Sequence, residues 1–528
     1  GGIPLAVELA ASRADSFGLE TLRDRIERSI SVYPVPSRRA GSRHATIEAC
    51  IAWSFNLLSP PEQELYRQLS VFQGGWTLED VQMVCGKDQI FEHDPVPVLL
   101  ALVDKSMIQP PVKSRYSFLE PLRQYALEML KATDKYEEVC LRHRNWFKTL
   151  ALRLSDKITG NNQADWIRKL SSDYPNIRAA IRWSLERNDT SAVLEFAGSL
   201  FWYWFNRGKV NEGLSYLLSV YPVPEKIPRD DFSRGLCAAP YLLWWTGDYS
   251  LAHEYADAIL SFSDRTEPEN RALILLVWAT AYTPTRNPEH YRKALEAYEE
   301  ALKIYREMDR SWGIIHCLLG ASVTRLHGIH PDFEPDFITA EKYLREASSL
   351  ADQINDIVHG AKIKIWLADC VLQCRSDIPA AIKLYAEVTQ MPSDIISPVD
   401  AALAFYTLAE FQLHKRDNDG AAKLLKHALD SALKCNTPLL ITNVLGRLSI
   451  CFYLSTNFVT SALLINYTSQ FRKHHSRTPD HFENEIIKLL RKAMVKEDFN
   501  NAAEQGFALN LEQAVDLARS ELQRLLPD

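Results

Sequence analysis

The sequence has no apolar run as long as the ~18 residues that a membrane-spanning helix requires, so no membrane span is expected. It has only nine cysteines, and apart from Cys370 and Cys374 they are scattered singly. An odd number of isolated thiols in a long chain is typical of the reducing cytoplasm, where we expect the protein to reside. No second pair lies at metal-ligand spacing from Cys370 and Cys374, so we interpret both as structural thiols rather than as a metal site.

Charge of one sign is also not in large excess. The 60 basic and 67 acidic side chains leave a formal net charge of −7, which does not direct the whole chain to nucleic acid or to an anionic membrane. The contents of 46% hydrophobic and 24% charged residues are those of an ordinary globular protein. A chain of 528 residues is too long for a single core, so two to four domains are expected.

Three catalytic motifs are missing from the sequence: GxxxxGK[ST], GxSxG and HExxH. Their absence removes the phosphate cradle of P-loop enzymes, the nucleophile elbow of α/β-hydrolases and a common zinc-protease site. We therefore expect this chain by itself to have no enzymatic activity, no catalytic residue, no metal and no cofactor.

What the sequence does have is a repeat. Segments such as GDYSLAHEYADAIL and EHYRKALEAYEEAL recur, and each follows an apolar segment that often carries Trp or Tyr. A small residue returns in each at intervals of 39, 42, 46, 41, 41 and 40 residues: Gly213, Ala252, Ala294, Ala340, Ala381, Ala422 and Ala462. Antiparallel helices that pack ~8–10 Å apart come closest where the side chain is no larger than Ala. The period predicts a mainly α-helical, tetratricopeptide-like solenoid of hairpins rather than a non-repeating α domain with chance spacing.

The rest of the chain divides by composition. Residues 1–45 comprise two short helices and a linker, and the start at Gly1-Gly2-Ile3-Pro4 suggests a fragment that begins inside a domain. Residues 46–131 have the order of a winged helix, with three helices and a β-hairpin. Residues 132–232 are a helical connector with the first repeat, 233–476 are the repeats, and 477–528 are a terminal cap with a turn at Gln505-Gly506 and a helix cap at Asn510. Within the connector, Asp173-Tyr174-Pro175-Asn176 is predicted to end one helix and start another.

A winged helix often binds DNA, and the charges argue against that role here. Residues 46–131 contain seven Lys or Arg against eleven Asp or Glu. The helix predicted at 77–85 begins with Glu79 and Asp80, where base-reading residues would lie, and these carboxylates repel phosphate. We expect a structural winged helix and no direct nucleic-acid binding.

Four tryptophans are candidates for a partner-binding face of the solenoid. They occur in the segments FWYWF and YLLWW as Trp202, Trp204, Trp244 and Trp245. Neighbouring positions on a helix point in different directions, so we expect one member of each pair to be exposed. The alternative is that all four belong to the hydrophobic core.

Several segments resemble the STAND-type signalling NTPases. GGIPLAVELAAS resembles the GLPLA motif of that family, in which the proline contacts adenine, and here the matching residue is Pro4. IEACIAWSFNLLSPPEQELYRQLSVFQGGWTLEDVQMVC, LLALVDKSMI and RYSFLEPLRQYALEML resemble the winged-helix segments of the family. The resemblance extends nearly from end to end and is strongest to AfsR-like and LuxR-type regulators, which join an NB-ARC nucleotide-binding module, a winged helix and a tetratricopeptide sensor.

The resemblance implies that this chain is the C-terminal portion of a regulatory ATPase. The parent would bind ATP or ADP through segments before Gly1, and an inducer or protein partner on the solenoid would favour an ATP-bound homo-oligomer. A nucleotide-contacting His-Asp pair of related NTPases matches Leu119 and Glu120, so the His is absent and Glu120 alone remains a candidate. The alternatives are a tetratricopeptide adaptor without a nucleotide switch and a winged-helix transcription factor.

Overall fold

The computed structural model describes residues 50–86, 88–91, 94–158, 163–221, 232–283, 287–327, 335–435, 437–474 and 481–526. Pro4 and the predicted elements of residues 1–45 lie outside these ranges. The chain falls into two compact units. The first comprises Gly1–Ser155 and Lys169–Phe196, and the second comprises Asp156–Arg168 and Ala197–Asp528.

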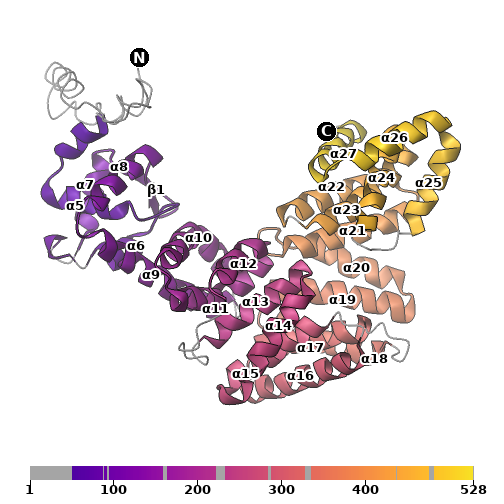
Figure 1. Ribbon diagram of the computed structural model, residues 1–528, viewed down its shortest axis with the longest axis horizontal. Coiled ribbons are helices and arrows are strands. Elements are labelled where there is room, and N and C mark those ends of the chain that lie inside the picture. The colour runs from indigo at the N-terminus through magenta and orange to yellow at the C-terminus, as the bar shows by residue number, and fades with distance from the viewer. Residues whose placement is uncertain are drawn as a thin grey trace. The chain divides into compact units, whose positions relative to one another are not determined.

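Unit 1 contains the predicted three helices and β-hairpin in the order of a winged helix (Figure 1). A helix that ends at Asn56 is followed by α5 Pro60–Leu69, α6 Leu78–Cys85, η1 Gln89–Phe91, α7 Val96–Asp104, β1 Gln109–Val112, β2 Arg115–Ser117 and α8 Glu120–Lys131. β1 and β2 pair antiparallel, and Trp76 adds a single antiparallel bridge to Tyr116 of β2. The remaining long helices are α9 Tyr136–Ile158, α10 Gln163–Glu186 and α11 Thr190–Asn206.

The start of α6 shows how the local sequence sets an element boundary. The Thr77 hydroxyl accepts a hydrogen bond from the Asp80 backbone N–H at 3.3 Å, and the Asp80 carboxylate accepts one from the Thr77 N–H at 2.7 Å. This reciprocal capping box satisfies two donors that the first turn of a helix leaves unpaired. Thr77 is therefore the N-cap of α6.

The predicted break at Pro175 is wrong, because α10 runs through it without interruption. Tertiary contacts within unit 1 hold this turn. The Asn176 side chain accepts from the Gln73 N–H at 2.6 Å and donates to the Gly75 carbonyl at 2.8 Å, while Asp173 pairs with Arg115 at 2.6 Å. These buried bonds offset the backbone hydrogen bond that a proline removes from a helix.

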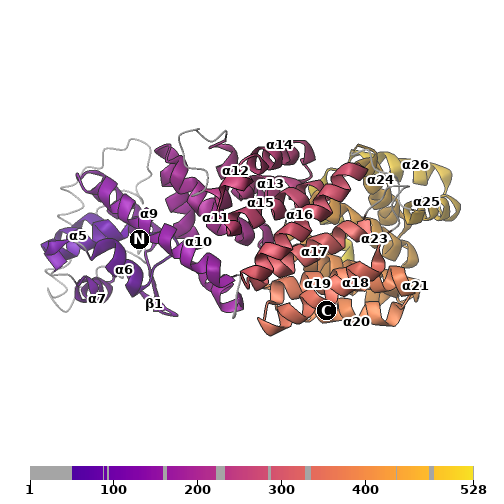
Figure 2. The same cartoon turned by 90° about the horizontal axis from the view of Figure 1, so that it is seen from below.

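Unit 2 is a stack of antiparallel helical hairpins that follow one another in chain order (Figures 1 and 2). After α12 Val210–Leu218 come six pairs: α13 Ser233–Thr246 with α14 Tyr249–Leu260, α15 Pro268–Tyr282 with α16 Pro288–Glu307, α17 Ser311–His327 with α18 Phe337–Gln353, α19 Ile357–Arg375 with α20 Ile378–Thr389, α21 Pro398–His414 with α22 Asn418–Lys434, and α23 Pro438–Leu454 with α24 Phe458–His474. A short helix, η2 Ser263–Arg265, joins α14 to α15. The chain continues in α25 His481–Ala493, α26 Lys496–Ala508 and α27 Leu511–Leu525. The predicted mainly α-helical solenoid is confirmed.

The first helix of each hairpin contacts the first helix of the next, from α13 through α15, α17, α19 and α21 to α23. These six helices, which we call the inner layer, pack closely on their neighbours in the stack. The second helices begin at similar turns, in which an Asp or Asn side chain accepts from a backbone N–H two or three residues on: Asp248, Asn287, Asp336, Asp377 and Asp417. Gly247, with φ +87°, forms the turn before Asp248, and Asp417 caps α22.

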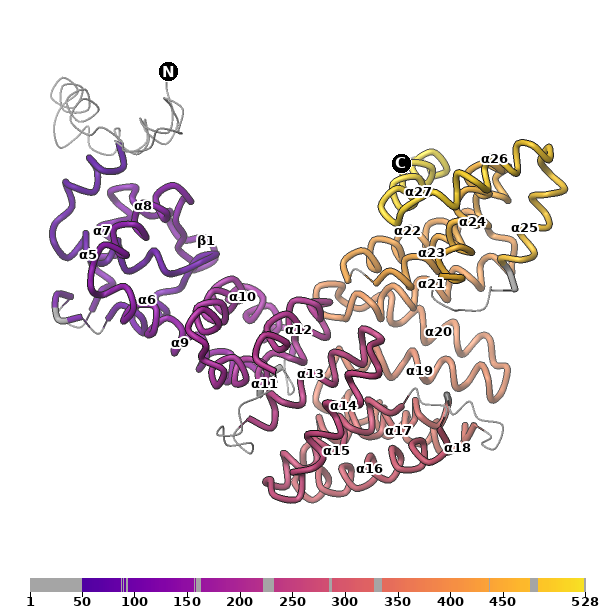
Figure 3. The backbone as a smooth tube through the Cα atoms, in the orientation of Figure 1, coloured from indigo at the N-terminus to yellow at the C-terminus, as the bar shows by residue number. Residues whose placement is uncertain are grey.

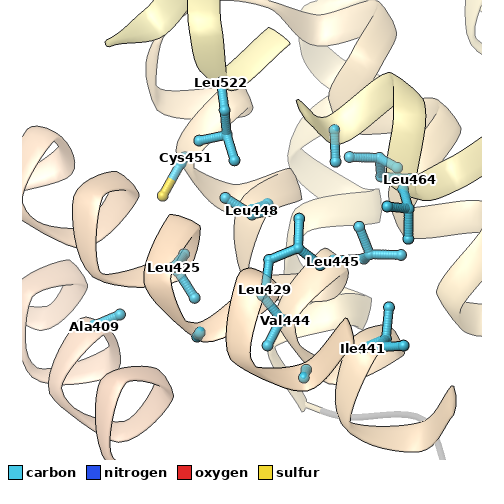
Figure 4. Close-up of a cluster of buried hydrophobic side chains, with 14 of the residues drawn as sticks. Ala409, Leu425, Leu429, Ile441, Val444, Leu445, Leu448, Cys451, Leu464 and Leu522 are labelled. Atoms are coloured by element: carbon cyan, nitrogen blue, oxygen red, sulfur yellow. The ribbon is translucent and has the colours of Figure 1, made fainter. Parts of the chain in front are cut away.

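The small residue of each repeat lies at a helix crossing, as predicted. The six alanines of the series are fully buried, with 0% exposure. At Gly213 even a methyl group has no room, because an added Cβ would lie 2.4 Å from the Trp204 ring. Around these crossings the hairpin cores are apolar, and Figure 4 shows aliphatic side chains of the cluster formed by α21 to α24 and α27. The stack therefore depends on side chains that end at Cβ.

The terminal cap differs from the prediction at one point. α26 continues through Gln505-Gly506, where a turn was expected. A Cβ added at Gly506 would lie 2.5 Å from the Leu463 carbonyl oxygen, so this glycine permits close packing of α26 on α24 instead of forming a turn. The predicted cap at Asn510 is confirmed, since its side chain accepts from the Gln513 N–H at 2.9 Å.

We expect Ala252→Leu to lower the free energy of unfolding by about 1–3 kcal/mol, because the larger side chain forces α14 away from its neighbours. Ala258→Leu is the matched control, since Ala258 lies on the same helix and is exposed. Urea titration of the purified chain checks both variants. Equal midpoints for the two would contradict the assigned role of the crossing residue.

Candidate functional site

Glu120, the proposed nucleotide-contacting residue, lies exposed in the first turn of α8. Its carboxylate accepts hydrogen bonds from Arg123 at 2.8 Å and from Gln124 at 3.1 Å. The Arg123 hydrogen bond is the main cause that holds the pKa of Glu120 below its usual value. The side chain is thus engaged within its own helix, and its role towards nucleotide remains a prediction.

The four candidate tryptophans are more buried than expected. Trp202 and Trp204 are 4% and 1% exposed, and Trp244 and Trp245 are half-buried. The prediction that one of each pair is exposed is therefore wrong. The reason is that α11 has packing partners on more than one side: Trp204 contacts Tyr216 of α12, whereas Trp202 contacts the inner layer.

Trp202 is inserted among aromatic rings of the inner layer. Its indole stacks on His359 of α19 with ring centroids 4.9 Å apart and an interplanar angle of 10°. It meets Trp312 and His316 of α17 edge-on, at 6.0 Å and 4.4 Å. These contacts are worth more than their buried area alone, because edge-to-face and offset-stacked rings attract each other electrostatically.

The two histidines belong to a buried hydrogen-bonded relay. Asp356 accepts from the His359 backbone N–H at 2.9 Å, and its carboxylate lies 2.5 Å from His359 Nδ1. His359 Nε2 in turn lies 2.9 Å from His316 Nδ1. Burial raises the pKa of Asp356, but the charge and hydrogen bonds of His359 outweigh it, so the net shift is downward. Burial, followed by the charges of His359 and Lys362, holds the pKa of His316 well below its usual value.

Two further ion pairs join successive helices of the inner layer. Lys362 of α19 lies 2.6 Å from the Asp400 carboxylate of α21, and its ammonium group is 4.8 Å from the centre of the Phe205 ring. Arg447 of α23 lies 2.7 Å from Glu410 of α21. Lys362, Asp400 and Arg447 are buried, and a buried charge is tolerated only when it is paired. Polar groups thus connect α17 to α19, α19 to α21 and α21 to α23.

Beside the Arg447–Glu410 pair is a pocket of about 540 Å³, a volume within the ~300–1,000 Å³ typical of small-ligand sites. α21, the turn after it, the start of α22 and α23 supply its walls, which are formed by Glu410, Leu413, His414, Arg416, Asn418, Arg447, Ile450 and Leu454. Its polar lining comprises two guanidinium groups, an imidazole and one carboxylate, and the rest of the wall is largely apolar. The pocket can therefore accept an apolar side chain that lies next to an acidic group.

The winged-helix-like part of unit 1 offers little to nucleic acid. The helix that directly precedes the β-hairpin is α7, not the helix at 77–85 considered from the sequence. In helix-turn-helix proteins the second helix of the pair enters the groove. α7 has the sequence VPVLLALVD, with no Lys or Arg, and it exposes Pro97, Leu100 and Asp104. An apolar and acidic face of this kind does not attract phosphate.

Two further searches of the described residues were negative. No cluster of three or more His, Cys, Asp or Glu side chains is arranged to hold a metal ion within those ranges. No helix in the same ranges is long and apolar enough to cross a bilayer.

We expect the stability of unit 2 to decrease as the pH falls below about 6.5, the usual pKa of histidine. Folding lowers the pKa of His316, so below pH 6.5 the unfolded chain binds a proton at this side chain and the folded chain does not. The contribution of neutral, buried His316 to the free energy of unfolding is therefore fully present above that pH and is lost as the pH falls. For one proton, the free energy of unfolding falls by at most about 1.4 kcal/mol per pH unit. His316→Gln should reduce the slope of stability against pH between 5 and 7.

The matched control for this measurement is His414→Gln, since His414 is exposed. Urea unfolding followed by tryptophan fluorescence at several pH values gives the slopes. The same slope for His316→Gln and the unsubstituted chain would contradict the assignment.

No family model matches the chain. A candidate HTH-type transcriptional regulator of Mycobacterium tuberculosis is 28% identical over 426 residues, which cover 78% of this chain and 46% of that protein. An uncharacterised protein of the same organism is 32% identical over 151 residues, which cover 28% of this chain and 38% of that one. The chain therefore spans about half the length, or less, of these curated relatives.

Among solved structures, a STAND protein with a tetratricopeptide repeat sensor from Pyrococcus horikoshii aligns with a TM-score of 0.51. The alignment covers 99% of this chain and 75% of that one, at 13% sequence identity. At this identity the likeness concerns the fold, and it agrees with the stacked hairpins of unit 2. The chain is thus similar in fold to a STAND protein with a tetratricopeptide sensor and similar in sequence to a candidate transcriptional regulator.

Proposed function

We propose that this chain is the winged-helix and sensor portion of a STAND-type regulatory ATPase that controls transcription or signalling. The observation that carries the proposal is the stack of hairpins, whose fold alignment with a STAND protein bearing a tetratricopeptide sensor extends over 99% of the chain. The similarity in sequence to a candidate transcriptional regulator supports the same assignment.

In this proposal the solenoid is the sensor, and its binding site is the pocket between α21 and α23. The Arg447–Glu410 pair fixes the orientation of two charged groups in the pocket wall, and Leu413, Ile450 and Leu454 supply the apolar part. An inducer or protein partner that binds one conformation more tightly shifts the equilibrium towards it. ATP or ADP would be held by the nucleotide-binding module of the parent, with Pro4 and Glu120 as the contributions of this chain.

Binding and hydrolysis of ATP distinguish the proposed ATPase switch from a tetratricopeptide adaptor without a nucleotide switch. We expect the purified 528-residue chain to show no ATP turnover, because its sequence has no P-loop to bind the phosphates. The complete natural reading frame that contains it should bind and hydrolyse ATP. A steady-state phosphate-release assay on both proteins tests this, and a complete protein without nucleotide binding would favour the adaptor.

Charge reversal at the rim of the pocket tests the sensor role. Arg416 lines the pocket and is exposed, so Arg416→Glu should weaken the binding of an acidic partner and leave stability within about 0.5 kcal/mol. Lys415→Glu is the matched control, because this neighbouring exposed residue does not line the pocket.

The measurement is RNA sequencing of strains that carry each substitution in the complete gene, compared with a deletion strain. We expect Arg416→Glu to reproduce the transcript changes of the deletion and Lys415→Glu to match the wild type. A wild-type transcript profile for Arg416→Glu would remove the pocket from the proposed function.

A further inference from the structure

The last turn of α11 and the turn that follows it, residues Trp202–Gly208, lie on the inner layer of the solenoid. We call this segment the α11 elbow; Figure 3 traces its course from α11 into α12. Trp202 reaches α13 through Tyr241, α17 through Trp312 and α19 through His359. One side chain of the elbow therefore touches three different hairpins of unit 2.

The remainder of the elbow extends this contact. The Phe205 ring meets Tyr241 at 5.2 Å and Trp245 at 4.8 Å, both edge-on, and the Lys362 ammonium lies over its face. Gly208, with φ +66°, lies so close to the C-terminal end of α22 that an added Cβ would be 3.0 Å from Cα and Cβ of Cys435. The elbow thus covers inner-layer surface from the first hairpin and reaches the end of the fifth.

The contact around the elbow leaves several buried polar atoms unpaired within the part of the chain that the structure describes. The cluster in Figure 4 is apolar, whereas several polar atoms around the elbow are buried and have no hydrogen-bond partner among the described residues. These atoms are the indole nitrogens of Trp202, Trp244 and Trp312, Oδ1 of Asn206 and Nη1 of Arg207. Buried polar groups in proteins are nearly always paired, so a cluster of unpaired ones marks a contact that is not optimised for stability alone.

We propose that the α11 elbow is an internal ligand of the solenoid and that a partner peptide binds the inner layer by displacing it. The partner carries an aromatic side chain, because the site now holds an indole between Tyr241, Trp312 and His359. Its backbone carbonyls supply acceptors for the indole N–H groups of Trp244 and Trp312, which the elbow leaves unpaired. An extended peptide offers such acceptors at regular intervals.

Displacement of the elbow provides a route for a signal. α11 is the helix in which the chain passes from unit 1, which ends at Phe196, to unit 2, which resumes at Ala197. A partner that replaces the elbow therefore acts on a helix that belongs to both units. The role of this displacement in signalling rests on the proposed sensor function. The binding of the elbow to the inner layer, and its release, can be tested independently of that function.

The first test locks the elbow in place. In Gly208→Cys the new Cβ would lie 3.0 Å from Cβ of Cys435, and a disulfide, which needs about 3.5–4.5 Å, is reached by a small shift. Oxidation with diamide should give an intramolecular disulfide with Cys435, identified by mass spectrometry of proteolytic peptides. Gly247→Cys is the matched control, because Gly247 also has a positive φ, and no atom lies within 4 Å of its added Cβ.

The second test measures release, with a defined probe. The probe is a peptide of the elbow sequence, LFWYWFNRGK, with two added lysines for solubility and a fluorophore. We expect it to bind Trp202→Ala or Trp202→Phe at least about tenfold more tightly than the oxidised Gly208→Cys chain, in which the site remains filled. Trp204→Phe is the control variant, because Trp204 packs on α12 and should not open the site.

The outcomes are distinguishable. Disulfide formation with Cys435, together with selective peptide binding to the Trp202 variants, supports the proposal. It is overturned if no intramolecular disulfide forms, or if the oxidised Gly208→Cys chain and the Trp202 variants bind the peptide equally. A wild-type transcript profile for Arg416→Glu would instead remove the pocket between α21 and α23 from the sensor proposal and leave the internal ligand standing.

Discussion

The close approach of two helices at a residue without atoms beyond Cβ is the constraint on which unit 2 depends. Six buried alanines provide it in the hairpins from α13 to α24, and Gly213 provides it at α12, where the Trp204 ring fills the remaining space. Once the helices of a hairpin are this close, hairpins can stack with first helix on first helix. The inner layer, and every candidate site on it, follows from that spacing.

Within the stack, buried polar side chains connect successive helices of the inner layer. The relay Asp356–His359–His316 and the pairs of Lys362 with Asp400 and of Arg447 with Glu410 each join different helices or turns of the stack. Such groups stabilise less than apolar side chains of equal size would, because their charges must be removed from water. The relay and both cations are buried in this structure, so here they act as polar joints between helices of the stack.

The solenoid could be predicted from the sequence because the pattern that specifies it is local. A small residue and a capping Asp or Asn recur at short range in each repeat, and both are set by contacts within one hairpin. The predicted order of helices and β-hairpin in residues 46–131 rests on similar local signals, such as the Thr77 capping box. Pro175 and Gly506 misled the prediction, because contacts with Gly74 and with the Leu463 carbonyl, distant in sequence, decide their conformation.

The candidate site was harder to predict from the sequence, because its contacts join residues that lie far apart in the chain. Burial of Trp202 depends on Tyr241, Trp312 and His359, which lie between 39 and 157 residues further along the chain. No local pattern reports such contacts. A weak signal did exist in the polar residues His359 and Lys362, which interrupt the largely apolar first helix of their repeat.

The contact between Gly208 and Cys435 has a consequence for how the molecule folds. Repeat arrays in which each unit touches only its neighbours can form and melt piecemeal, from either end. Here a residue before the first hairpin touches the end of the fifth, 227 positions later, so the array is closed by a long-range contact. Formation of that contact requires a large loop-closure entropy, which predicts slow, cooperative assembly in which the intervening hairpins are gained or lost together.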